Sequence, residues 1–105
     1  MIKLLAVLLA ANVLAPSGIL ATPTKYDRRN VEVLGIVRAI AVRQIPGGVV
    51  AQFALCDSLC VNVVEYSKPY FAVGQSLTVG GKFYVIYSNG VIQARNVVIV
   101  GSPAI

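Results

Sequence analysis

The sequence predicts a small all-β domain in which five strands close into a barrel and one hairpin is tied by a disulfide. Three observations lead to this prediction. Apolar and polar side chains alternate over several runs between residues 31 and 100, as they do in half-buried strands. Glycines and prolines separate these runs at turn positions. Two cysteines, Cys56 and Cys60, bracket three residues within the most regular run.

Residues 49–66 form the hairpin around which the other strands are placed. Folding this run about Ser58 brings three pairs into register: Cys56 with Cys60, Ala54 with Asn62, and Gln52 with Val64. A disulfide between the cysteines closes a short ring, so chain entropy contributes only about 2 kcal/mol to stability. Its expected role is to set the hairpin register. The alternative is a reactive dithiol, which needs a lowered thiol pKa and lacks C-x-x-C spacing here.

Residues 1–21 are typical of a secretory signal peptide. Lys3 gives a basic start, residues 4–15 are apolar and too short to span a bilayer, and Ala21 is a small residue at the expected cleavage point. We therefore expect a periplasmic or secreted protein that begins at Thr22 and has no transmembrane segment after processing. An uncleaved N-terminal anchor is the alternative.

The remaining chain is expected to form one domain, residues 31–101, between a mobile basic arm at residues 22–30 and a tail at residues 102–105. Residues 31–44 predict a long first strand that bends at Gly35 and belongs to both halves of the barrel. A turn at residues 45–48 leads into the tied hairpin. A crossover without a long helix follows it, with two aromatic side chains expected to plug the barrel: Tyr70 and Phe71.

Residues 77–87 and 91–100 predict a second hairpin. Asn89-Gly90 between them is a strong signal for a two-residue type I′ turn, because both residues accept positive φ angles. The apolar phase of the last strand slips near Arg95-Asn96, which predicts a bulge there.

The composition argues against several function classes. The chain has no His and a formal net charge of +5. Two cysteines without His cannot complete a structural zinc site, and no pair of cooperating catalytic groups is evident. We expect a non-enzymatic protein with no catalytic residue, no metal and no cofactor. The positive charge favours anionic partners through long-range steering but identifies none.

The predicted strand order resembles that of the OB-fold, a five-stranded Greek-key barrel. Four motifs carry the resemblance: V-x-G-x-V at residues 33–37, F-x-L-x-D at 53–57, V-x-V at 61–63 and, at 73–81, a segment similar to G-x-x-V-x-V-x-G with Leu77 in place of the first Val. Residues 97–100 also match the closing strand. Together with the signal peptide, they make the chain similar to small periplasmic bacterial OB-fold proteins. The resemblance implies binding of a small molecule or another envelope component, with a possible link to stress tolerance.

The outer face of the tied hairpin is the first candidate binding surface, with Gln52, Asn62, Val64 and Tyr66 as its ligand-binding residues. Its short neutral side chains suit a neutral partner held by hydrogen bonds. The turns at residues 47–48 and 89–90 are expected to flank it. A second candidate face combines three residues of the other hairpin, where Tyr84 is expected opposite Arg95: Lys82, Tyr84 and Arg95.

Two other functions remain open. The first is an oligomeric, glycan-binding protein, because toxin B subunits are similarly small exported OB barrels. Aromatic side chains at Tyr70, Phe71, Tyr84 and Tyr87 would then form subunit or sugar-stacking surfaces. The second is binding of single-stranded nucleic acid, which needs stacking aromatics and cations. The hairpin face at residues 50–66 has one aromatic side chain and no Lys or Arg, so nucleic acid ranks below a small molecule or protein.

Overall fold

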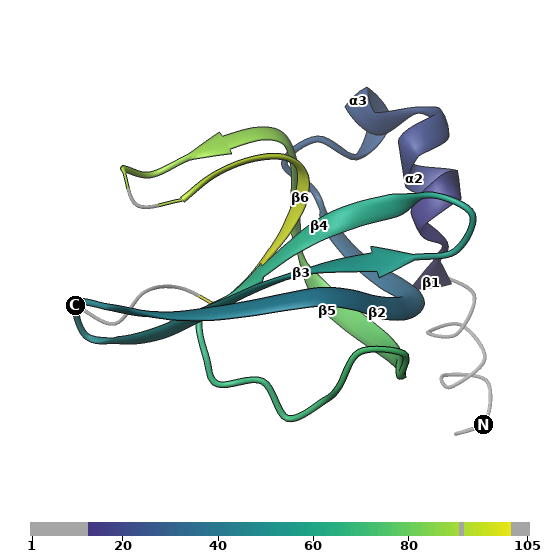
Figure 1. Cartoon of the computed structure of the whole chain (residues 1–105). Helices are drawn as coiled ribbons and strands as arrows, with labels where there is room; N and C mark the ends of the chain where they lie inside the picture. Colours follow the sequence, from purple (N-terminus) through teal and green to yellow (C-terminus); the bar gives the residue numbers. More distant parts are fainter. Residues whose placement is uncertain (1–12, 91, 102–105) are drawn as a thin grey trace, which may run out of the picture.

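The computed structural model describes residues 13–90 and 92–101, most of which lie in strands (Figure 1). The elements in chain order are β1 (Val13–Leu14), α2 (Pro16–Ala21), α3 (Pro23–Tyr26), β2 (Asn30–Ile45), β3 (Gly48–Cys56), β4 (Cys60–Glu65), β5 (Ser76–Ser88) and β6 (Gln93–Val100).

The strands form one sheet that closes on itself. Their order is β1-β2-β3-β4-β6-β5, and an additional pairing of β2 with β5 joins the two sides into a ring. The predicted β class and barrel-like closure are confirmed. The sheet has six strands where five were expected, because β1 pairs with β2 in parallel. The two short helices, α2 and α3, are also additions to the prediction.

The long strand β2 connects the two halves of the ring, as predicted. It pairs with β5 through residues 30–36 and with β3 from residue 36 onward. At the change of partner, Gly35 lies so close to β3 that an added Cβ would be 2.9 Å from the backbone nitrogen of Cys56. Only glycine, which has no Cβ, permits this approach.

The β3–β4 hairpin has the predicted register, including Cys56 opposite Cys60 and Gln52 opposite Val64. The cysteines form a disulfide with a Cα–Cα distance of 4.0 Å. The turn before β3 is also as predicted, because Ile45 pairs with Gly48 and leaves a two-residue turn.

Two clusters of buried side chains lie on opposite faces of the β3–β4 hairpin. The first fills the ring and contains these buried residues: Ile19, Val31, Val33, Val37, Phe53, Leu55, Val61, Val63, Val79, Phe83 and Val98. The second contains Val50, Val64, Ile92 and Val97. Because strand side chains alternate between faces, Val50 and Val64 point away from the first cluster. The face predicted to be exposed is therefore covered over part of its length.

The β5–β6 hairpin has a longer loop than the predicted two-residue turn. Ser88 pairs with Gln93, so residues 89–92 form the loop. Ile92 is only 2 % exposed within the second cluster, and the Asn89 side-chain oxygen accepts its N–H at 2.8 Å. Burial of Ile92 outweighs the local Asn-Gly preference, and every later pair shifts by two residues.

No extra residue is inserted into β6 at Arg95-Asn96, where a bulge was predicted. The pairing offset is the same on both sides, since Tyr84 pairs with Val97 and Ile86 with Arg95. Instead, Asn96 has a φ of 48°, a left-handed conformation that Asn tolerates better than most residues. This conformation produces, at Asn96, the slip in side-chain phase that the sequence pattern indicated.

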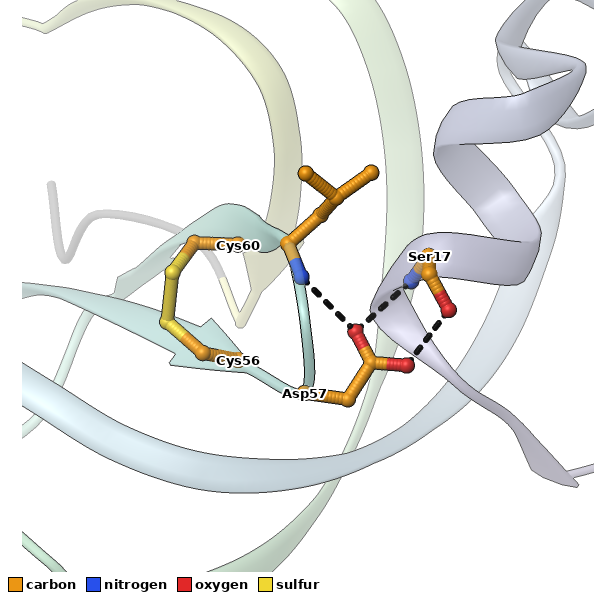
Figure 2. Close-up of a disulfide and its surroundings, with 5 residues drawn as sticks. Ser17, Cys56, Asp57 and Cys60 are labelled. Atoms are coloured by element: carbon orange, nitrogen blue, oxygen red, sulfur yellow. Dashed lines mark hydrogen bonds between the residues drawn. A yellow bond between two sulfur atoms is a disulfide. The ribbon is translucent and has the colours of Figure 1, made fainter.

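The N-terminal described residues pack against the sheet. Figure 2 shows the Ser17 backbone N–H and hydroxyl donating to the Asp57 carboxylate beside the disulfide, the former at 3.0 Å. Ile19 is fully buried in the first cluster. The predicted signal peptide thus falls in two parts: residues 1–12 lie outside the described residues, and residues 13–21 contribute β1 and α2. No helix among the described residues is long and apolar enough to cross a membrane.

The basic arm at residues 22–30 is bound along β5, which differs from the expected mobile segment. The Arg28 N–H donates to the Phe83 carbonyl at 2.6 Å, and the Phe83 N–H donates to the Arg29 carbonyl at 2.9 Å. The Asp27 carboxylate accepts the Val85 N–H at 2.9 Å. The predicted tail at residues 102–105 lies outside the described residues.

The crossover at residues 66–75 has no helix. The Phe71 ring lies 4.8 Å from the Phe53 ring and packs against the first cluster. Tyr70 is 80 % exposed. Of the two predicted plugs, only Phe71 contributes to the core.

The contact between Ser17 and Asp57 gives a pH-dependent prediction. The Ser17 hydroxyl, as the largest effect, holds the pKa of Asp57 below its ordinary value of 3.8. A lowered folded-state pKa stabilises the protein above the unfolded-state pKa, and this stabilisation is lost as pH falls through the folded value. We expect Ser17→Ala to raise the pKa of Asp57, measured by carboxyl NMR titration of the full chain. Ser58→Ala, in the same loop, is the control. An unchanged Asp57 titration would show that α2 does not contact this loop.

The register of the second hairpin gives another prediction. Ile92→Ala should lower the free energy of unfolding by about 2 to 5 kcal/mol, because it leaves a cavity in the second cluster. Ile86→Ala changes the same hairpin at a side chain that is 61 % exposed, and should cost less than about 0.5 kcal/mol. Denaturant unfolding compares the two. Equal losses would contradict the buried position of Ile92.

Candidate functional site

A hollow of about 350 Å³ lies on the face of the β3–β4 hairpin that the sequence singled out. We call it the outer hollow. It is lined by Ala39 and Ala41 of β2, Gln52, Phe53 and Ala54 of β3, Asn62, Val63 and Val64 of β4, and Gln93 and Ala94 of β6. Four strands therefore contribute, where the sequence pointed to only two.

The outer hollow exists because β4 and β6 separate. They pair in parallel from Asn62 opposite Val97 onward. Before that point, residues 93–95 pair only with β5. The left-handed Asn96 lies at the junction, so the strand changes direction where it leaves β4. Gln93 and Ala94 consequently form a wall across from the β3–β4 surface.

A β-bulge in β2 forms the opposite wall. Arg38 pairs with Ala54 and Ala41 pairs with Gln52, so two residues of β2 face one residue of β3. One of the two, Ala39, has a φ of 54°. A residue with a Cβ pays roughly 1 to 2 kcal/mol for this conformation. Such strain is common where a protein holds a binding surface in a fixed shape.

Three side-chain amides supply the polar groups of the outer hollow: Gln52, Asn62 and Gln93. The Asn62 amide nitrogen donates to the Arg95 carbonyl at 2.7 Å, which bridges the gap between β4 and β6. This bond orients Asn62 and leaves its oxygen as an acceptor. Within the described residues, the amides of Gln52 and Gln93 have no hydrogen-bond partner. Each can offer donors and acceptors to a ligand.

The structure brings together three of the four residues predicted for this site. Gln52, Asn62 and Val64 all line the outer hollow, although Val64 is only 1 % exposed and forms its floor. Tyr66 is not among the lining residues. The reason is that Tyr66 packs against the second cluster, beside the β5–β6 loop.

Tyr66 and Tyr87 hold that loop in place. The Asn89 amide nitrogen donates to the Tyr66 hydroxyl at 2.8 Å and to the Tyr87 hydroxyl at 3.2 Å. The pKa of Tyr87 is raised, mainly by burial and next by the Tyr66 hydroxyl. The protonated form is therefore favoured, and it keeps the hydroxyl available within this network. These two tyrosines stabilise the wall that carries Gln93.

The second candidate face is not assembled as predicted. Tyr84 pairs with Val97, while Arg95 pairs with Ile86. The Tyr84 ring instead packs 5.0 Å from the Tyr87 ring, and Lys82 is exposed two residues away. The cause is the four-residue loop, which moves Arg95 by two positions relative to β5.

Sequence reasoning missed two cations near the outer hollow. Arg38 pairs with Ala54 and Arg43 pairs with Val50. Directly paired residues place their side chains on the same face of a sheet, so both arginines share the face of the outer hollow. The hairpin at residues 50–66 contains neither. Only the register of β2 against β3, including the bulge, brings them there.

The residues that line the outer hollow are all uncharged, so it can offer hydrogen bonds and apolar contact. Within residues 13–90 and 92–101, no group of three or more His, Cys, Asp or Glu side chains is placed to hold a metal ion.

The strained bulge gives a testable prediction. Ala39→Gly removes the cost of a left-handed alanine, roughly 1 to 2 kcal/mol, and adds the entropic cost of glycine, roughly 0.5 to 1 kcal/mol. We expect it to leave the free energy of unfolding unchanged or to raise it by up to about 1.5 kcal/mol. Ala41→Gly, two residues along the same strand, should lower it by roughly 0.5 to 1 kcal/mol. Urea unfolding measures both, and equal losses would contradict the positive φ of Ala39.

Comparisons with protein-family models, with curated proteins and with solved structures find no match for this chain. The chemistry of its surfaces is therefore the basis for a functional proposal. The outer hollow contains three of the four residues predicted for the binding surface, and the separation of β4 from β6 leaves open space beside them.

Proposed function

We propose that this protein is an exported, non-enzymatic OB-fold binding module whose ligand occupies the outer hollow. The strand connectivity supports the fold proposal. Apart from β1, the strands follow the order β2-β3-β4-β6-β5, and β5 returns to β2. This is the order expected for a five-stranded Greek-key OB barrel, and β2 has the shared role of its first strand.

The position of the outer hollow is the observation that carries the functional proposal. OB-folds bind ligands on the face of their second and third strands, between the loops that follow strands 1 and 4. Here the outer hollow lies on β3 and β4, and the β2–β3 and β5–β6 hairpins extend to the same side of the molecule, at the left of Figure 1. Its volume of about 350 Å³ is near the small end of ligand sites, which span about 300 to 1,000 Å³.

The lining favours a small polar ligand. Four alanines leave room close to the sheet, and three amides offer directed hydrogen bonds. An uncharged ligand rich in hydroxyl or amide groups would match these amides. Such a ligand is either a free small molecule or an exposed part of an envelope component. The disulfide is compatible with an oxidising compartment, as the proposed export requires.

The test places charge in the outer hollow. A set of neutral mono- and disaccharides and small amides is titrated into the isotopically labelled full chain, and backbone amide shifts are recorded. We expect a binding compound to shift Ala41, Gln52 and Asn62 together. The double variant Gln52→Lys with Asn62→Lys should weaken binding at least about tenfold, because an amide partner is lost at each position.

Thr78→Lys is the matched control, because it adds charge at an exposed position of β5 that does not line the outer hollow. It should leave the affinity unchanged. A compound that binds the double variant as tightly as the original protein would place the site elsewhere. A set that produces no shifts in these three residues would remove the support for a small neutral ligand.

Binding of single-stranded nucleic acid is the second candidate, and Arg38 and Arg43 favour it because they share the face of the outer hollow. Phosphate contacts make affinity fall steeply with salt, whereas binding of a neutral ligand depends little on salt. Oligonucleotide titrations at two salt concentrations distinguish the two. The glycan-binding oligomer has less support, because Phe71, Tyr84 and Tyr87 pack against the protein's own clusters and only Tyr70 of the four aromatic side chains is largely exposed.

A further inference from the structure

A second hollow, of about 500 Å³, lies where β1, α3 and the start of β2 meet. We call it the basic hollow. It shares no lining residue with the outer hollow. Leu14 and Tyr26 give it apolar walls, and Lys25, Arg29, Asn30 and Glu32 give it polar ones. Nothing in the proposed function uses this site.

Positive charge around the basic hollow is only partly balanced. Lys25 and Arg29 line it, and within the described residues neither is in an ion pair. The Lys25 ammonium lies 5.5 Å from the centre of the Tyr26 ring. Lys82 pairs with Asn30 across β2 and β5 and so lies on the same face. Two cations therefore line the space, against one lining carboxylate, Glu32, and Lys82 lies on the adjoining part of β5.

Backbone hydrogen bonds to β5 hold the segment that carries Arg29. Arg28 and Arg29 are paired with Phe83 through two backbone hydrogen bonds. Arg28 has a φ of 64°, a strained conformation for a residue with a Cβ. The nearby Asp27 carboxylate accepts the Val85 N–H, so a β5 backbone group engages it. The turn thus ties Asp27 to β5, while Lys25 and Arg29 line the basic hollow.

We propose that, in a chain that retains residues 13–21 and with them Leu14, the basic hollow binds an organic anion with an apolar body. Arg29 and Lys25 would hold the anionic group, because a guanidinium can form two parallel hydrogen bonds to a phosphate or carboxylate. Leu14 and the Tyr26 ring would contact the apolar body. The apolar wall and the cations are both needed for a preference for an organic anion, since cations alone would bind inorganic phosphate equally well.

Phenyl phosphate is the probe, titrated into the full chain at low salt and followed by amide NMR shifts. Benzoate distinguishes carboxylate from phosphate recognition, inorganic phosphate lacks the apolar body, and benzyl alcohol lacks the charge. We expect phenyl phosphate or benzoate to bind more tightly than inorganic phosphate, and benzyl alcohol not to bind. Added salt should weaken the binding, because these side chains are exposed.

Arg29→Gln should weaken binding of the preferred probe about tenfold, the usual scale for a charged hydrogen bond, and Lys25→Gln should also weaken it. Lys68→Gln removes an exposed charge that does not line the basic hollow and should have no effect. Leu14→Ser should bring the affinity down to that of inorganic phosphate. Equal affinity in all variants would overturn the proposal, as would binding to anionic lipid vesicles without binding to either soluble probe. Because the outer hollow shares no lining residue, its own test does not depend on this result.

Discussion

The close approach of Gly35 to Cys56 is the contact on which the rest of the sheet depends. At this point β2 passes from β5 to β3, and a side chain at residue 35 would push β3 away. The same contact fixes where Cys56 lies, and with it the tied hairpin. Every other element packs on the ring that results. A second close approach, Gly81 against the Ile99 carbonyl, serves the β5–β6 side of the ring in the same way.

The second cluster explains why the uncovered part of the β3–β4 outer face is small. Here Ile92 and three tyrosines cover one end of the β3–β4 outer face, while the bulge at Ala39 raises the edge nearby. The uncovered part, between these features, is the outer hollow. The side chains that close the face at one end thus define the space left open at the other.

Much of the fold was accessible from sequence patterns, because those patterns report local constraints. Strand alternation and the cysteine spacing gave the β3–β4 register correctly, and Gly35 marked the shared strand. The failures involve contacts between distant residues. Asn89-Gly90 favours a tight turn locally, but burial of Ile92 against Val50 and Val64 decides the register.

The candidate site was predictable to a similar degree. Gln52, Asn62 and Val64 follow from the hairpin alone. Tyr66 was assigned to the site, but its hydroxyl accepts a hydrogen bond from Asn89 of the β5–β6 loop. Arg38 was missed because the bulge in β2 determines on which face of the sheet its side chain lies. A single sequence contains no signal for either effect.

The Asp57 carboxylate contacts residues on both sides of the expected cleavage point after Ala21. Its bond to the Leu59 N–H lies inside the disulfide loop and belongs to the domain alone. Its bonds to Ser17 reach into the stretch that a signal peptidase would remove by cutting after Ala21. Under the proposed export, the disulfide forms in an oxidising compartment, and a molecule with both the disulfide and the Ser17 contact would have been exported with residues 13–21 still attached. On this proposal, the ionisation of one surface carboxylate would distinguish a chain that keeps residues 13–21 from one that has lost them, because loss of the Ser17 hydroxyl raises the pKa of Asp57.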